Sequence, residues 1–311
     1  MIKQKLLLVV LTRNPGEVFD DWIAALNGLK DKPDSVLVID SSSTDGTQSK
    51  AEAAGFSVVV IDQADFNHGS TRQIAVNSHP ECEFIVFMTQ DAILSSPDAL
   101  KNLLRPFDDN AVGAVCGRQL PRVNAGPIEA HARIYNYPEQ SSLRTFEDSR
   151  TMGVRAAFLS NSFAAYRISA LSAVGGFPDD VIFGEDMYVA ARLLKAGYKI
   201  AYAADACVYH SHSYSIMQEF KRYFDMGVFH VREPWIRQEF GSVAGEGMKF
   251  LVSEYNYLFR HAFWKIPEAI LRAIFRYAGF RLGLLEPHLP ASIKPLFSMN
   301  SSYFSKNTPC V

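Results

Sequence analysis

The chain has 311 residues, a formal net charge of −2 and 48% hydrophobic residues, among them 22 phenylalanines. This length and apolar content suit one large α/β domain, or a domain with an appendage, around a substantial core. The small net charge excludes the global basic field that is typical of nucleic-acid-binding proteins, so no nucleic-acid partner is expected. No stretch reaches the roughly 18 uncharged apolar residues of a membrane span.

The four cysteines are Cys82, Cys116, Cys207 and Cys310, which lie far apart and form no CxxC pair. This spacing argues against structural zinc and against a disulfide scaffold. Free thiols are typical of a reducing compartment, so we expect a cytoplasmic protein.

The first ninety residues alternate between apolar runs and segments with helical periodicity. Strands are expected at 6–11, 36–39, 57–61 and 84–88, and helices at 17–29, 47–54 and 70–78. Continuous apolar strands that alternate with helices predict a doubly wound, mostly parallel sheet flanked by helices. Ligands of such sheets bind at the carboxyl ends of the strands.

Polar residues stand where three of these strands end: Thr12 and Arg13, Asp40 to Ser42, and Gln90 with Asp91. We expect them on one edge of the sheet. A carboxylate at the end of a buried strand, such as Asp40, is a useful acceptor for a base or ribose hydrogen bond. Asp91 can bind a hard divalent cation through oxygen, although a lone aspartate at this position is often only a turn former.

After about residue 118 the alternation loosens. Residues 119–150 are expected to be irregular with some helix, 154–166 to form a strand pair near the site, and 198–202 to form another strand. His210 and His212 follow that last strand and flank a serine. Either imidazole can supply a nitrogen ligand to the ion held by Asp91, and the sequence does not decide which.

An adjacent acidic pair, Glu185 and Asp186, follows Gly184 and opens a helical pattern. The end of a helix where backbone N–H groups point outward stabilises negative charge. One of the two carboxylates can therefore stay ionised and act as a general base. The alternative is that both only cap the helix, as such pairs commonly do.

These motifs together resemble the family-2 glycosyltransferases. The segment 40–47, DSSSTDGT, resembles the signature DDGSTDGT, and Gly175–Phe177, Gly184–Asp186 and Arg192–Gly197 resemble the GGF…ED…RL…G segment. Motifs similar to those of bacterial rhamnosyltransferases stand at Asp65–Arg72, Ser160–Tyr166 and His210–Tyr214. The resemblance covers about residues 6–212.

The resemblance implies a GT-A fold for residues 1–214 and inverting transfer of a sugar from a nucleotide-sugar donor. The donor implied is dTDP-L-rhamnose, and the acceptor is a glycan or lipid-linked glycan of a cell-surface polysaccharide such as O-antigen. A divalent cation, Mg²⁺ or Mn²⁺, is also implied. However, Ser41 replaces the second acid of the first signature, and the usual DxD is reduced to Thr89-Gln90-Asp91.

The roles implied for single residues follow the motifs. Asp186 would be the base, with Glu185 as its alternative, and the ligands of the cation would be Asp91, His210 and His212. The donor would be bound by Thr12, Arg13, Asp40, Ser42, His68, Arg72 and Gln90.

Three other functions remain to be weighed. A family-2 enzyme that uses a UDP-hexose is the nearest, because uracil and thymine share a pairing edge. A nucleotide-sugar-binding protein without catalysis is a second, favoured by the lone acid Asp91 and opposed by the intact acidic pair. A dinucleotide-dependent oxidoreductase is disfavoured because no GxGxxG follows the first strand.

Residues 215–311 are expected to be a helical, aromatic extension that contacts acceptor, membrane or a second copy of the chain. In the helix expected from Pro267 to Gly283, one face carries Ile270, Ala273, Ile274, Tyr277 and Phe280, and another carries Lys265, Arg272 and Arg276. The helix either packs its apolar face on the domain or lies peripherally on an anionic membrane surface through its basic residues.

Overall fold

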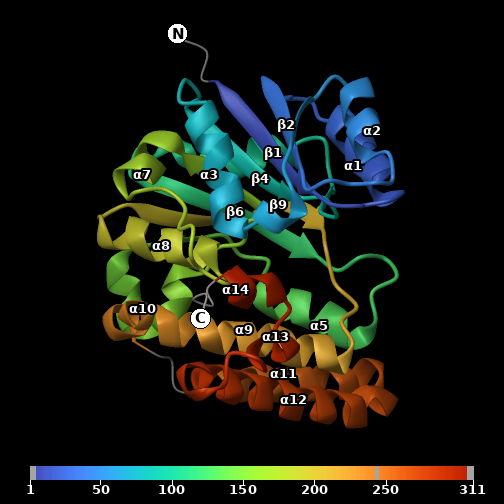
Figure 1. Cartoon of the computed structure of the whole chain (residues 1–311), viewed down its shortest axis with the longest axis vertical. Helices are drawn as coiled ribbons and strands as arrows, with labels where there is room; N and C mark the ends of the chain where they lie inside the picture. The colour runs from blue at the N-terminus through green and yellow to red at the C-terminus, as the bar shows by residue number, and fades with distance from the viewer. Residues whose placement is uncertain (1–4, 242–244, 307–311) are drawn as a thin grey trace.

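A computed structural model describes residues 5–241 and 245–306. Its centre is one nine-stranded sheet in the order β3-β2-β1-β4-β8-β6-β9-β5, with β7 paired to β9 (Figure 1). The strands are β1 (Leu6–Thr12), β2 (Ser35–Asp40), β3 (Ser57–Val60), β4 (Phe84–Thr89), β5 (Ile93–Leu94), β6 (Val112–Leu120), β7 (Ser142–Arg144), β8 (Phe163–Arg167) and β9 (Lys199–Tyr209).

The sheet is mixed, with four parallel and four antiparallel strand pairs, although its first four strands form the parallel unit that the sequence predicts. β1, β2, β3 and β4 pair in parallel, and β6 and β9 run in the same direction. β8 is antiparallel and lies between β4 and β6, while β5 and β7 are antiparallel to β9. The antiparallel β8 joins two parallel units into one sheet.

Helices cover both faces of this sheet (Figure 1). The α-helices of the described residues are α1 (Val18–Asn27), α2 (Thr47–Ala53), α3 (His68–Ser78), α4 (Ala99–Leu104), α5 (Pro127–Asn136), α6 (Ser149–Met152), α7 (Ile168–Ala173), α8 (Glu185–Lys195), α9 (Ile216–Arg232), α10 (Pro234–Phe240), α11 (Glu246–His261), α12 (Ile266–Leu284), α13 (Lys294–Phe297) and α14 (Ser301–Lys306). The three helices and four strands expected in the first ninety residues are confirmed within two residues at each end.

Alternate residues of the central strands enter two cores, one on each face. Leu8 and Val10 of β1 pack in the core that contains Trp22 of α1. Leu7 and Val9 pack in the other core, which extends to helices α3, α7 and α8. Because both faces of β1 are buried, its sequence reads as a continuous apolar run rather than an alternating one.

The strand pair expected at 154–166 is wrong. Residues Gly153–Ala157 form a 3₁₀ turn, and only Phe163–Arg167 form a strand. The buried guanidinium of Arg144 donates to the backbone oxygens of Arg155 and Ala156, so these carbonyls have a side-chain partner instead of a neighbouring strand. β6 was missed, because it spans the residues where the alternation loosens.

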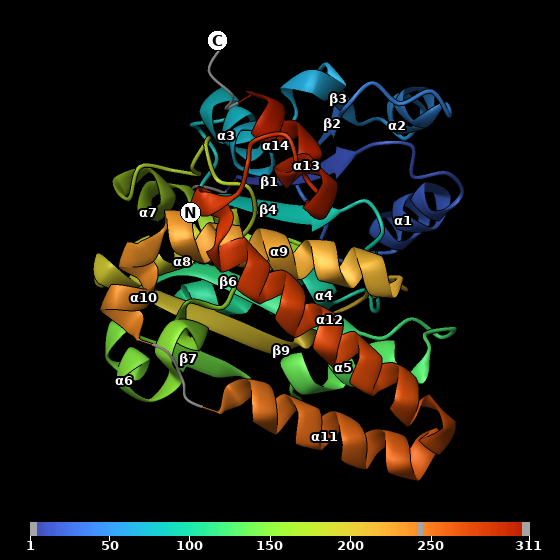
Figure 2. The same ribbon diagram turned by 60° about the horizontal axis from the view of Figure 1, so that its bottom comes forward.

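All regular elements described between Ile216 and Lys306 are helical, as expected. Phe224 and Val228 of α9 and Phe240 of α10 join this region to the core of the sheet. A small separate cluster of Leu258, Ala262 and Ala269 lies between α11 and α12. Figure 2 shows α9 and α12 packed side by side, with α11 beyond them. Among the described residues, no helix has both the length and the apolar character to cross a membrane.

Cys82, Cys116 and Cys207 are free thiols, as the spacing of the cysteines predicts. Cys310 lies outside the described residues.

Candidate active site

The carboxyl ends of β1, β2 and β4 bring five of the seven expected donor-binding residues together in what we call the donor rim, namely Thr12, Arg13, Asp40, Ser42 and Gln90. Its centre is the carboxylate of Asp40, which is fully buried. Thr12 Oγ1 donates to Asp40 Oδ2 at 2.8 Å, Gln48 Nε2 donates to Oδ1 at 2.7 Å, and Ser43 donates through both its backbone N–H and its hydroxyl. Burial alone would raise the pKa of Asp40, but these hydrogen bonds hold it below its ordinary value. The carboxylate is therefore ionised and already has four donors.

The remaining rim residues hold the loops in place. Gln90 Oε1 accepts from the backbone N–H of Arg13 at 2.7 Å, and its amide nitrogen donates back to the Arg13 carbonyl at 3.2 Å. Arg13 Nη1 donates to the Ser41 carbonyl at 2.8 Å. Ser42 has a left-handed backbone, with φ of 58°, and its hydroxyl donates to the Ile61 carbonyl. The rim is a connected network, and contact of these residues with a donor stays a prediction.

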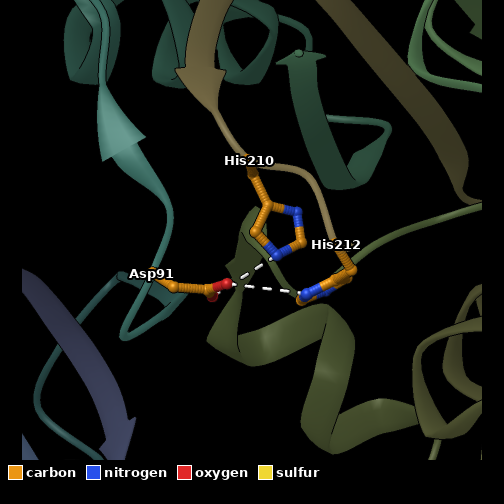
Figure 3. A group of neighbouring side chains, drawn as sticks. All are labelled: Asp91, His210 and His212. Carbon is orange, nitrogen blue, oxygen red and sulfur yellow. Dashed lines mark ion pairs between the residues drawn. The ribbon is translucent and has the colours of Figure 1, made fainter. Parts of the chain in front are cut away.

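Asp91, His210 and His212 form a compact cluster beside the rim (Figure 3). Asp91 follows β4, and both histidines follow β9. His210 Nε2 lies 3.4 Å from Asp91 Oδ1, and His212 Nδ1 lies 3.7 Å from Oδ2. One potential ligand atom from each residue lies within 4.8 Å of the other two. The structure thus joins residues that are about 120 positions apart in the sequence.

The proton positions at His210 follow from its other neighbour, Gln119. Gln119 Oε1 accepts from Arg133 Nη1, and Gln119 Nε2 donates to Ser160 Oγ at 2.9 Å. Because an arginine can only donate, these contacts fix which end of the amide is the oxygen. His210 Nδ1 lies 2.8 Å from that oxygen and must therefore carry the proton.

A neutral His210 then has a bare lone pair on Nε2. This atom is buried and has no hydrogen-bond partner, although Asp91 lies nearby. Burial lowers the pKa of His210, and burial together with His210 lowers the pKa of His212 to about 3, so both rings are neutral at neutral pH. A lone pair facing a carboxylate is repulsive unless a cation lies between them. The three residues therefore fit a divalent cation, and Gln119 orients one ligand.

The acidic pair begins α8, where Gly184 is the N-cap and adopts φ of 78°. Gly184 has no side chain, and Asp186 Oδ1 accepts from the first-turn backbone N–H of Met187, so Asp186 takes part in capping the helix. Capping does not account for Glu185, whose carboxylate pairs with Arg72. Glu185 is 6% exposed and accepts from Arg72 Nη1 at 2.9 Å and from Asn161 Nδ2 at 3.0 Å. Burial would raise the pKa of Glu185, but Arg72, His68 and Asn161 keep it below its ordinary value. Glu185 is therefore the permanently charged member.

Asp186 has the opposite character. Burial and the neighbouring charge of Glu185 raise its pKa to about 7, against two backbone hydrogen bonds that lower it. These come from Met187 N at 2.8 Å and Asn161 N at 3.3 Å. A carboxyl group with a pKa near the operating pH is well suited to take a proton in the transition state.

The structure places His68 and Arg72 with the acidic pair rather than with the donor rim. Arg72 is 3% exposed, pairs with Glu185 and donates to the His68 carbonyl at 2.8 Å. Burial lowers the pKa of His68 despite the nearby Glu185, so its ring is neutral. Contact of His68 and Arg72 with the donor stays a prediction. Within the protein, Arg72 pairs with Glu185, and His68 lies beside both.

Comparison with known proteins identifies the chain. The profile of "Glycosyl transferase family group 2" matches residues 84–278. The O-antigen chain rhamnosyltransferase WbaN of Salmonella anatum is 45% identical over 299 residues, which are 96% of this chain and 95% of that protein. RfbN of Salmonella typhimurium, of the same description, is 43% identical over 302 residues, or 97% and 96%. The chain belongs to the family-2 glycosyltransferases.

Solved structures confirm the GT-A fold of this glycosyltransferase. The mannosyltransferase PcManGT from Pyrobaculum calidifontis, in complex with GDP-Man and Mn²⁺, is similar with a TM-score of 0.57 at 19% identity, over 97% of this chain and 85% of that one. S. aureus TarS 1–349 in complex with UDP-GlcNAc gives 0.55 at 17%, over 98% and 89%.

The site of this glycosyltransferase includes residues to which the motifs assigned no role. The loop Ser160–Ser162 joins its two halves, because Ser160 holds Gln119 and Asn161 contacts both members of the acidic pair. The similarity of this segment to rhamnosyltransferase motifs was the available signal. No motif pointed to Gln119, because it lies in β6, a strand that the sequence pattern did not predict.

Proposed function

We propose that this enzyme transfers L-rhamnose from dTDP-L-rhamnose to a glycan acceptor of O-antigen type, with inversion at the anomeric carbon. The observation that carries the proposal is the position of Asp186 at the start of α8, with a pKa of about 7, in one hydrogen-bonded frame with the cation cluster. Two relatives of matching length, both described as O-antigen chain rhamnosyltransferases, support the choice of sugar.

In the proposed reaction, the acceptor hydroxyl oxygen attacks C1 of the sugar while its proton passes to the Asp186 carboxylate. The new bond joins the acceptor oxygen to C1. The bond from C1 to the diphosphate oxygen breaks, and its electron pair leaves with the nucleoside diphosphate. Glu185 stays ionised beside Arg72 and keeps the pKa of Asp186 high, so that Asp186 can accept a proton near neutral pH.

Asp91, His210 and His212 would hold a divalent cation, which supplies positive charge to neutralise the diphosphate of the donor. Two imidazole nitrogens and one carboxylate suit a transition-metal ion such as Mn²⁺ better than Mg²⁺, which prefers oxygen ligands. We propose that the donor rim holds the nucleoside. Because the Asp40 carboxylate already has four donors, direct contact with the base would require one of them to be exchanged.

The division at residue 214 is proposed as a division of roles. Residues 1–214 would carry the donor, the cation and the base, and residues 215–311 would face the acceptor and its surroundings. The expected cytoplasmic location and homo-oligomerisation remain predictions.

The test is a donor panel with nucleoside diphosphate release as the readout, measured with and without acceptor glycan. We expect release of dTDP from dTDP-L-rhamnose that depends on acceptor. Turnover of a UDP-hexose with no turnover of dTDP-L-rhamnose would overturn the sugar assignment. Binding of donor without release in the presence of any acceptor would favour a non-catalytic binding protein.

A further inference from the structure

Helices α11 and α12 and the turn between them expose an unusually apolar surface, which we call the hairpin face. Twelve of the 22 exposed large apolar side chains among the described residues lie between Met248 and Leu285. They are Met248, Leu251, Val252, Tyr255 and Phe259 on α11, Phe263 and Trp264 in the turn, Ile270, Leu271, Ile274 and Tyr277 on α12, and Leu285. A concentration of this kind marks a surface that meets an apolar partner.

The orientation of α12 is opposite to the expectation from its amphipathic pattern. Ile274 is 57% exposed and Tyr277 is 63% exposed, whereas Arg276 is buried. Arg276 pairs with Glu219 at 2.9 Å and with Glu254 at 3.4 Å. The prediction that the apolar face packs on the domain is therefore wrong. The basic residues face inward because they form ion pairs with Glu219, Glu254 and Glu268.

The other expected lipid-binding cations are also engaged within the protein. Arg272 pairs with Glu219 at 2.8 Å and with Glu268 at 2.7 Å, and Lys265 also pairs with Glu268 at 2.7 Å. Binding to a membrane through the Lys265, Arg272 and Arg276 face is therefore ruled out by their positions. Any membrane contact of α12 has to use its outer, apolar face.

Close glycine contacts hold α12 rigidly in this orientation. A Cβ atom added at Gly279 would lie 2.2 Å from the Phe220 carbonyl oxygen, and one at Gly283 would lie 2.2 Å from that of Phe224. Both carbonyls belong to α9, so the two helix backbones are nearly in contact. α12 is therefore packed tightly against α9, and this packing fixes the orientation in which its apolar face points outward.

The charges around the hairpin face are of one sign. Arg260 and Arg281 are exposed, and Lys249 is exposed but paired with Glu246 at 2.8 Å. The three acids between residues 245 and 285 are Glu246, Glu254 and Glu268, each of which is ion-paired and none of which is exposed. An isologous contact between two copies would bring this positive border against itself with no exposed acid to pair it. An anionic surface complements it.

We propose that the hairpin face docks on an anionic lipid membrane. Aromatic side chains such as Trp264 and Tyr277 suit the boundary between headgroups and acyl chains, and exposed arginines at the border suit lipid phosphates. The apolar side chains supply most of the binding, and Arg260 and Arg281 strengthen it on anionic lipid.

The inner face of α12, opposite the hairpin face, is connected to the candidate cation cluster. Arg272 Nη1 donates to the Tyr214 carbonyl at 2.8 Å, and the Tyr214 ring stacks on His212 with centroids 5.0 Å apart. Docking would thus hold the site beside the membrane, where a lipid-linked acceptor is available. Only this last step rests on the proposed function, because membrane binding itself needs no donor.

The experiment is co-sedimentation with vesicles of phosphatidylglycerol and phosphatidylcholine in equal parts, without donor or acceptor. We expect the wild-type protein to pellet, and Ile274→Asp to reduce its partition by at least about tenfold, because a charge would enter the apolar contact. Leu296→Asp is the matched control, since Leu296 is a 65% exposed apolar residue on α13, outside the face. This variant should pellet like wild type.

Tryptophan fluorescence adds a second readout. Trp264 is 63% exposed, whereas Trp22 is buried and Trp235 is half-buried on α10, outside the hairpin face. Vesicles should therefore shift the emission of Trp264 to shorter wavelength. The shift should vanish in Trp264→Phe, which should still pellet. A wild-type protein that stays in the supernatant overturns the proposal, as does equal loss of binding in Ile274→Asp and Leu296→Asp. A wild-type dimer that Ile274→Asp splits, with no vesicle binding, would assign the face to a second copy instead.

Discussion

The donor rim and the region around the acidic pair are both polar and both buried, but their groups are satisfied to different degrees. In the rim, the Asp40 carboxylate has four donors and a pKa below its ordinary value. In the acidic pair, the pKa of Asp186 is raised to about 7, and in the adjoining cation cluster His210 Nε2 has no partner. The polar groups of the donor rim already have hydrogen-bond partners within the protein. By contrast, a cation would supply the partner that His210 Nε2 lacks, and a proton would relieve the repulsion between Asp186 and Glu185.

This difference indicates that the donor rim serves binding and that the acidic pair and the cation cluster serve the reaction. A carboxylate held by four hydrogen bonds positions loops, and substitution there should change binding. A carboxyl group that is buried beside another charge exchanges a proton readily near neutral pH, and substitution there should change the rate.

The sharpest test of this contrast is Asp186→Asn. We expect transfer to fall by about 10²–10⁴-fold, because the general base is lost, while donor binding stays close to that of the wild type. Single-turnover transfer and equilibrium donor binding measure the two effects. Near-native transfer would move the base elsewhere, with Glu185 as the first candidate.

Arg72→Met should reveal whether Arg72 serves the acidic pair or the donor. Because Glu185 would lose its buried partner, we expect a loss of about 3–5 kcal/mol in the free energy of unfolding. Urea denaturation at pH 7 measures this loss, and the double variant Arg72→Met, Glu185→Gln should recover part of it. If the stability is unchanged and donor binding is weaker, Arg72 serves the donor and not the acidic pair.

Gln119→Leu should weaken the cation site without touching a ligand. It removes the acceptor that keeps the proton of His210 on Nδ1, so we expect the affinity for Mn²⁺ to fall by about 10–100-fold. Isothermal titration of the enzyme with Mn²⁺ alone gives the affinity. Gln48→Leu is the control, because it removes an amide from the donor rim and should leave Mn²⁺ affinity unchanged.

The pH dependence should give the smallest but most specific effect. Asp186 is a base only when ionised, and its pKa of about 7 means that the ionised form declines below pH 7. We expect kcat/KM to drop about tenfold per pH unit below 7 and to level off above it. A flat profile between pH 5 and 8 would contradict an active base with a raised pKa.

The stability of the folded protein should depend on pH in the opposite direction to its activity, and Asp186→Asn should remove this dependence. The pKa of Asp186 is higher in the folded protein than in the unfolded chain, so the stability that its proton contributes is full below about pH 4 and is lost as the pH rises to 7. The asparagine variant avoids this loss. Its melting temperature relative to the wild type should therefore be higher at pH 8 than at pH 5.

The sequence was sufficient for features that depend on local pattern. The parallel strands are continuous apolar runs, the acidic pair follows a glycine that starts a helix, and His210 and His212 follow a strand end. Gln119 and Arg72 were different, because their roles depend on tertiary contacts with residues far away in the sequence. The antiparallel β8 between β4 and β6 brings Ser160 to Gln119, and no local periodicity reports that arrangement.

The inverted orientation of α12 has a similar reason. Its periodicity correctly predicts a helix with one apolar and one basic face, but not which face is inside. Glu219, which pairs with Arg276, lies 57 residues away on α9, and the glycines that allow close contact act only when that helix is adjacent. The choice between faces is made by tertiary contacts.

The raised pKa of Asp186 is tested most directly by ¹³C NMR titration of the aspartate carboxyl carbons, with Asp186→Asn to assign the signal. We predict that the signal missing from the variant titrates with a midpoint near pH 7 in the wild type. In Glu185→Gln, where the neighbouring charge is removed, the midpoint should be lower. A wild-type midpoint near 4, the ordinary value for an aspartate, would contradict Asp186 as a base tuned by burial and by Glu185.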